Sequence, residues 1–154
     1  MSDRGAFTAA IVTAVLILAG AFVLPQFFFF ESAKALIFIA IAVLIFYGED
    51  RYSYMLGIVF PPLWFIVDIV VGSLGQDLRV ALDFLSGRFA SPLNTPLNAV
   101  ARLTAIVLFI LCVRAWRKQV TEKFLGKTFW TCLVISLVYI ALLTLWYLRL
   151  FSKS

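Results

Sequence analysis

Long apolar stretches, separated by short polar ones, set the organisation of this chain. Several windows of membrane-spanning length contain almost no charge, and their hydrophobic residues run continuously. Continuous runs of this length are typical of transmembrane helices, whereas strands of a membrane barrel alternate between lipid-facing and lumen-facing residues. The pattern therefore predicts an all-α, polytopic integral membrane helical bundle. We expect a single transmembrane domain over residues 1–154, with five spans: about 6–24, 31–47, 54–75, 97–116 and 128–148.

Composition supports this class of protein. The chain is 64% hydrophobic and 14% charged, which is more apolar than a soluble domain of this size. Its mean hydropathy is +1.05. Most of the basic residues behind the net charge of +5 flank the spans, which indicates contact with anionic lipid and not with nucleic acid. We therefore expect membrane lipids, and either other membrane protein subunits or further copies of the chain, as partners.

The first span carries a row of small residues. Ala6, Ala10 and Ala14 are four residues apart, and Ala21 falls on the same side of a helix. Such a row lets another helix approach closely, although alanine is also simply common in spans. Residues 19–21 resemble a small-residue cleavage site, so a signal peptide is the alternative interpretation of this stretch.

Four consecutive phenylalanines, Phe27 to Phe30, come before Glu31 and the second span. They anchor the hairpin near a bilayer boundary, or they line a pocket for a lipid, quinone or pigment tail. The span at about 31–47 is short for a bilayer, so part of the phenylalanine run can belong to it.

The third span, at about 54–75, contains two features that are costly in a membrane helix. Pro62 has no amide hydrogen and Pro61 clashes with the preceding turn, so we expect a candidate helix break, a kink or an opening near residues 57–60. Carbonyls freed in an open helix can bind an ion or a substrate; a simple kink is the alternative. Asp68 is an ionisable group at bilayer depth, so it should face protein or a wet cavity and have a partner.

Arg102, in the first two turns of the fourth span, is the expected partner of Asp68. Counted from Gly75, Asp68 lies ~10 Å inside the bundle, and Arg102, counted from Leu97, lies at ~8 Å. An arginine side chain can close that offset and donate two parallel hydrogen bonds to a carboxylate. We predict an intramembrane ion pair of these two residues that fixes the register of the two helices. A solute or proton site is the alternative role.

The one long connection, residues 76–98, predicts an amphipathic interfacial helix at about 77–86. Leu78, Leu82 and Leu85 follow helical spacing, and charged residues occupy the other faces. The stretch is too short and too charged to span, so we expect it to lie on the membrane surface. It either docks a partner or seals its own bundle.

The densest charge cluster follows the fourth span and predicts the orientation of the chain. Cytoplasmic loops carry an excess of lysine and arginine, so we expect the 114–127 loop and the N-terminus to be cytoplasmic, in a bacterial-type inner membrane. The loop could also recognise anionic lipid headgroups or an acidic partner. Its basic residues are Arg114, Arg117, Lys118, Lys123 and Lys127.

Candidate catalytic chemistry is sparse. The chain has no histidine, and two lone cysteines, Cys112 and Cys132, cannot form a zinc or iron–sulfur site by themselves. Asp68 supplies at most half of an acid–base pair. We therefore predict no catalytic residues, no metal site and no cofactor, and we assign no cofactor-binding residue. The expected protein is not an enzyme.

Two classes of function remain open. The first is a small non-catalytic integral membrane subunit, or an assembly or scaffold component, of a larger membrane protein complex. The alternative is a transporter or channel component with a site around the Pro61–Pro62 break and Asp68. An enzyme that acts on lipids is the least supported, because no second acid–base group accompanies Asp68.

Overall fold

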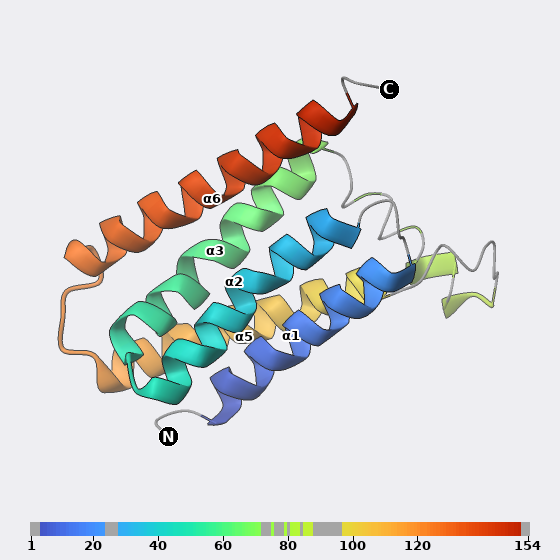
Figure 1. The fold of residues 1–154 in the computed structure, drawn as a ribbon. Coiled ribbons are helices and arrows are strands. Elements are labelled where there is room, and N and C mark those ends of the chain that lie inside the picture. Colours follow the sequence, from blue (N-terminus) through green and yellow to red (C-terminus); the bar gives the residue numbers. More distant parts are fainter. Residues whose placement is uncertain are drawn as a thin grey trace.

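A computed structural model describes residues 4–23, 28–71, 75, 79, 81–83, 85–87 and 97–151. This part of the chain contains five helices that are long and apolar enough to cross a membrane, so the predicted all-α bundle is confirmed. Consecutive helices run in opposite directions, and α1 begins at one end of the bundle while α6 ends at the other (Figure 1). The helices are α1 (Arg4–Val23), α2 (Phe28–Tyr47), α3 (Asp50–Val71), α5 (Leu97–Gln119) and α6 (Lys127–Phe151).

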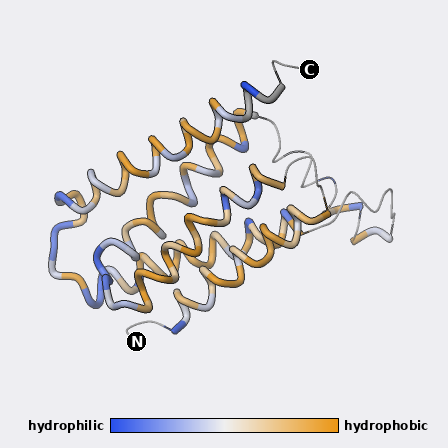
Figure 2. The backbone as a smooth tube through the Cα atoms, viewed as in Figure 1, coloured by the Kyte–Doolittle hydropathy of each residue, from blue (hydrophilic) through white to orange (hydrophobic). Residues whose placement is uncertain are grey.

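Hydrophilic residues gather at the ends of these helices, and apolar residues run along their lengths (Figure 2). This distribution matches a bilayer, in which charged groups stay at the water interface and apolar side chains face lipid or other helices. Many large side chains along the helices are exposed in consequence, for example Val15 on α1 and Leu142 on α6.

Helix α3 is the centre of the bundle. It packs against α2, α5 and α6, whereas α1 packs against α2 and α5. About 61% of the membrane-spanning apolar stretch of α3 is buried inside the bundle, compared with 17% of the corresponding stretch of α6. Helix α6 is therefore peripheral, and α3 provides nearly all of its contacts. Helices α5 and α6 are consecutive along the chain but do not contact each other.

A two-residue turn joins α2 to α3. The amide of Gly48 donates to the carbonyl of Ile45 at 3.2 Å, and the amide of Glu49 donates to the carbonyl of Leu44 at 2.9 Å. These are the two hydrogen bonds of a Schellman motif, and the φ of +81° at Gly48 is the left-handed conformation that the motif needs. Because the turn is complete at Glu49, α3 begins at Asp50, four residues before the predicted start of the third span.

The small-residue row of α1 is a packing face. Ala6, Ala10, Ala14 and Ala21 are all at most 2% exposed, on the side of α1 that meets α2 and α5. Small side chains let helix backbones approach, so the row brings α1 close to both neighbours. Of the two interpretations of these alanines, the packing face is confirmed.

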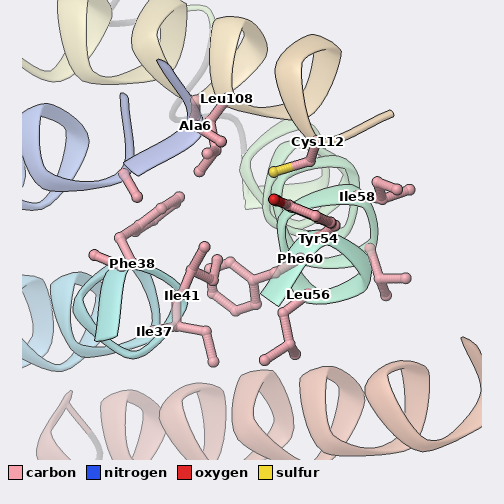
Figure 3. Packing of buried hydrophobic residues seen from close by; sticks show 14 of the residues in the cluster. Ala6, Ile37, Phe38, Ile41, Tyr54, Leu56, Ile58, Phe60, Leu108 and Cys112 are labelled. Atoms are coloured by element: carbon pink, nitrogen blue, oxygen red, sulfur yellow. The ribbon is translucent and has the colours of Figure 1, made fainter. Parts of the chain in front are cut away.

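Aromatic rings fill the space between α2 and α3. The ring centroid of Phe38 lies 5.6 Å from that of Phe60 and 5.6 Å from that of Trp64, both in edge-on arrangements. Figure 3 shows Phe38 and Ile41 of α2 facing the residues of α3 in this core. Edge-on aromatic pairs of this kind are stabilising beyond the area that they bury.

The helix is not interrupted at the expected break, and a kink at this position stays a prediction. Helix α3 continues through Pro61 and Pro62 from Asp50 to Val71. Neither proline can donate to the carbonyl four residues earlier, at Gly57 and Ile58, but packing on three sides holds the helix together. The contact with α5 is especially close at Gly57, where a Cβ would come 2.4 Å from the sulfur of Cys112.

Several further boundaries differ from the expected ones; for example, α6 runs to Phe151, three residues past the expected end of the fifth span. Helix α2 begins at Phe28, so Phe28 to Phe30 form its first turn, and α5 extends to Gln119. Phe27 lies outside the described residues.

Within the expected interfacial helix, residues 79, 81–83 and 85 are helical, and the amide of Ser86 donates to the carbonyl of Leu82 at 2.9 Å. The other residues of 77–86 lie outside the described part, and the position of this helix relative to a membrane stays a prediction.

We expect Gly57→Ala to destabilise the bundle by about 1–3 kcal/mol, the usual cost of overpacking, because the new methyl group would overlap the Cys112 sulfur. The double variant Gly57→Ala/Cys112→Ala should recover part of this loss. Thermal unfolding in detergent measures both effects. Gly75→Ala is the matched control, since nothing lies within 4 Å of a Cβ there. Equal losses at Gly57 and Gly75 would contradict the close contact of α3 and α5.

Candidate functional site

Asp68 of α3 and Arg102 of α5 meet inside the bundle. The Nε and Nη2 atoms of Arg102 lie 3.0 Å and 2.9 Å from Oδ2 of Asp68. The two side chains are only 10% and 11% exposed. Hydrogen bonds between ionised groups are roughly twice as strong as neutral ones, and water does not screen a buried pair well. The structure thus brings together the two charges for which the sequence predicted an ion pair.

The positions of the two helices explain this meeting. Helices α3 and α5 are in contact and run in opposite directions, so residues near the end of α3 and near the start of α5 lie at the same level. Asp68 is three residues from Val71, and Arg102 is five residues from Leu97. These offsets correspond to ~5 and ~8 Å along the helix axes, a gap that an arginine side chain covers.

A second pair of charges lies at the same end of the bundle. In the first turns of α2, the Nζ atom of Lys34 lies 2.6 Å from Glu31. The same ammonium lies 4.8 Å from the ring centroid of Phe30 and 5.7 Å from that of Trp64. Cation–π contacts at these distances help to hold Lys34 against α3. The sequence did not single out this arrangement, because only the fold brings α2 next to Trp64.

Trp64 also connects this pair to the core. Its side chain is buried, and its Nε1 atom has no hydrogen-bond partner among the described residues. It is one helical turn before Asp68 on α3, so the two side chains lie on one face of that helix. A buried indole N–H without a partner is unusual in a native structure. The end of the bundle that holds the Asp68–Arg102 pair therefore also holds a hydrogen-bond donor, Trp64, with no acceptor among the described residues.

The basic residues singled out in the sequence lie at the opposite end of the bundle. Arg114, Arg117 and Lys118 occupy the last turns of α5, Lys123 is in the link to α6, and Lys127 begins α6. All five side chains are exposed. They form one surface at the membrane boundary and are not brought together with the Asp68–Arg102 pair.

Glu122, within this basic surface, fixes the start of α6. Its carboxylate accepts hydrogen bonds from the Thr128 hydroxyl at 2.7 Å and the Thr128 amide at 3.3 Å. These bonds, together with the charge of Arg51 4.0 Å away, hold the pKa of Glu122 below its ordinary value. A carboxylate at a helix N-terminus also interacts favourably with the helix dipole. Gly126 leaves room for it, since a Cβ there would come 2.3 Å from Oε1 of Glu122.

Other polar contacts between helices were missed by sequence reasoning. Tyr54 is fully buried, and its hydroxyl donates to Gln119 of α5 at 2.9 Å. Tyr47 is 77% exposed, as an interfacial residue would be. No pattern in the sequence separates Tyr54 from Tyr47 and Tyr52, because burial depends on which side of α3 meets α5.

A threonine pair joins α1 to α5 in the same way. The Thr13 hydroxyl donates to the Thr104 hydroxyl at 2.9 Å, and the Thr104 hydroxyl donates to the carbonyl of Ala101 at 2.8 Å. Hydrogen bonds between helices stabilise packing in a bilayer, where water is not available as an alternative partner.

Cys112 and Cys132 are both free and buried. The sulfur of Cys132 lies 3.9 Å from the carbonyl oxygen of Tyr52, and Cys132 lies on the face of α6 that packs on α3 together with Thr128 and Ser136. This face of α6 is therefore small and mildly polar. Among the residues that the structure describes, no group of three or more histidine, cysteine or acidic side chains could hold a metal ion.

Fold and sites together define the class of protein: an α-helical bundle built for insertion in a membrane, with a buried ion pair at one end and a basic surface at the other. Comparison with protein-family models, with curated proteins and with solved structures finds no match.

We expect Asp68→Asn and Arg102→Gln each to destabilise the bundle by about 3–5 kcal/mol, because each leaves one buried charge without its partner. The double variant should lose less than the sum of the two, with a coupling energy of about 1–3 kcal/mol. Unfolding of the four proteins in the same detergent gives the double-mutant cycle. Strictly additive losses would contradict an energetic coupling between the two side chains.

Proposed function

We propose that the chain is a small non-catalytic integral membrane subunit, an assembly or scaffold component of a larger membrane protein complex. The observation that carries this proposal is an exposed groove of about 510 Å³ between α1 and α5. Small residues form half of its lining: Gly5, Thr8 and Ala9 on α1, and Thr104 on α5; the other half is Arg4, Val12, Val107 and Leu111. Grooves lined by small residues are where a further transmembrane helix can approach closely.

The two hydroxyl groups of this groove are already satisfied. The Thr8 hydroxyl donates to the carbonyl of Arg4 at 2.8 Å, and the Thr104 hydroxyl donates within its own helix. An incoming helix therefore meets a largely apolar surface, with the charged Arg4 only at the start of α1. Helix α1 thus has two small-residue faces. The alanine row is used inside the bundle, whereas Gly5 and Thr8 are exposed in the groove and Ala9 is half-buried beside them.

A transporter or channel component is the second candidate function. The observation in its favour is the Asp68–Arg102 pair, because ionisable groups at membrane depth often mark ion or solute pathways. The second ground for a transporter was an opened helix with free carbonyls at Pro61 and Pro62. Because α3 is continuous there, that ground is removed. A pair whose charges neutralise each other serves more simply to fix the register of α3 and α5.

For the orientation, we propose that the 114–127 loop and the N-terminus face the cytoplasm of a bacterial-type inner membrane. Arg4, at the start of α1, and the loop after α5 are at the same end of the bundle (Figure 1). The dense, exposed basic residues of that loop support the cytoplasmic assignment, since cytoplasmic loops carry the excess of lysine and arginine.

We expect Ala9→Phe to release a partner helix, because the larger side chain fills the groove. Affinity purification in mild detergent should give a stoichiometric complex for the wild-type chain and several-fold less partner for the variant. Val15→Phe is the matched control, since Val15 is an exposed residue of α1 outside the groove. A second copy as the partner would mean self-association. A lone chain that moves a solute into liposomes, with a flux abolished by Asp68→Asn, would instead establish the transporter.

We expect Lys123→Cys, in a background without Cys112 and Cys132, to react with a membrane-impermeant maleimide only after the membrane is opened. Lys123 is exposed in the link between α5 and α6. Arg149→Cys, exposed near the end of α6, is the matched position at the opposite end of the bundle and should react in intact cells. The reverse pattern of labelling would overturn the proposed orientation.

A further inference from the structure

A cleft of about 680 Å³ lies between α5 and α6 on the surface of α3. It exists because both helices pack on α3 but do not contact each other. Ile58 and Pro62 of α3 form its floor, and Val113 of α5 and Leu133 of α6 line its two sides. Figure 3 shows Ile58 on the side of α3 that points away from Phe38 of α2.

Three aromatic side chains close one end of this cleft. The ring centroid of Phe124, in the link, lies 6.3 Å from that of Trp116 on α5 and 5.9 Å from that of Phe129 on α6. This row connects the two sides of the cleft across the α5–α6 link. Trp116 is only 4% exposed, so its ring belongs to the lining and not to the outer surface.

The same end of the cleft is basic. Arg117 lines the cleft, and Lys118 and Lys123 are exposed on the same turn of α5 and on the link. Glu122 also lines it, but its carboxylate is bound by Thr128 and lies 4.0 Å from Arg51, which offsets its charge. The positive charge of Arg117 therefore dominates at this end, and the residues that line the cleft are otherwise apolar, apart from Glu122.

The depth of the cleft matches one leaflet of a bilayer. Arg117 is in the last turn of α5, and Phe109, which also lines the cleft, is eight residues earlier. Eight residues of helix correspond to ~12 Å, compared with ~15 Å for half of the hydrocarbon core. The lining thus runs from the level of the headgroups toward the middle of the membrane.

We propose that this cleft binds one anionic phospholipid, with an acyl chain between α5 and α6 and the phosphate at Arg117. Its volume falls within the ~300–1,000 Å³ that is usual for small-molecule sites. The basic end complements a lipid phosphate, and the apolar length complements an acyl chain. The aromatic row across the link favours a lipid over a partner helix, because a membrane-spanning helix would have to continue past that closed end.

Quenching of Trp116 by brominated acyl chains tests this site. Phenylalanine replaces the other three tryptophans, Trp64, Trp130 and Trp146, and the protein is reconstituted in phosphatidylcholine vesicles. A small fraction of brominated phosphatidylglycerol should quench Trp116 several-fold more than the same fraction of brominated phosphatidylcholine. Val113→Phe, which fills the cleft, should reduce quenching by both lipids.

Two arginines of α5 provide the matched comparison. Arg117→Gln should abolish the preference for phosphatidylglycerol, whereas Arg114→Gln, equally exposed but outside the cleft lining, should keep it. Equal quenching by the two lipids in the unsubstituted protein would overturn the proposal, and so would an identical loss in both arginine variants. Displacement by excess glycerol phosphate would also overturn it, since that result identifies a site for the free anion.

A second measurement does not depend on the tryptophan substitutions. Native mass spectrometry of the wild-type chain from mild detergent should show one retained phosphatidylglycerol, and Arg117→Gln should lose it while Arg114→Gln retains it. Circular dichroism of each variant verifies that the helices are intact. A wild-type chain that retains no lipid, or retains phosphatidylcholine equally well, would contradict the site.

Discussion

The close packing of α3 against three other helices is the constraint on which the rest of this bundle depends. Its contact with α5 is tight enough that Gly57 has no room for a side chain beside Cys112, and its contact with α6 uses the small residues Cys132 and Ser136. In lipid, where no hydrophobic force drives helices together, such close approach is a main source of stability. The same packing keeps α3 continuous through two prolines, and it brings Asp68 to Arg102.

The features that sequence reasoning found are those with a local or periodic origin. Span positions follow from runs of apolar residues, and the buried alanine row of α1 follows from a spacing of four. The meeting of Asp68 and Arg102 could be expected because a helix has a fixed rise, so the depth of each charge can be counted from the end of its span. In each case the length of an apolar run, the spacing of residues or the rise of a helix was enough to predict the feature.

The features that it missed depend on which sides of the helices meet. Nothing in the sequence separates Tyr54, which is buried against Gln119, from Tyr52, which is partly exposed two residues earlier. The break at Pro61 and Pro62 was expected from the local backbone alone, but packing against other helices keeps α3 continuous there. The cleft between α5 and α6 could not be predicted either, because it results from a contact that two consecutive helices do not make.

The peripheral attachment of α6 has a consequence for the order of events during synthesis. Helices α1, α2, α3 and α5 form a set in which each member contacts at least two others, so that set can be complete before α6 leaves the ribosome. Helix α6 then adds to a finished surface of α3. Because it buries the smallest share of its span, we expect it to separate at a lower free energy than the other four described helices. A helix that joins the bundle after these four is thus also the first that they can release.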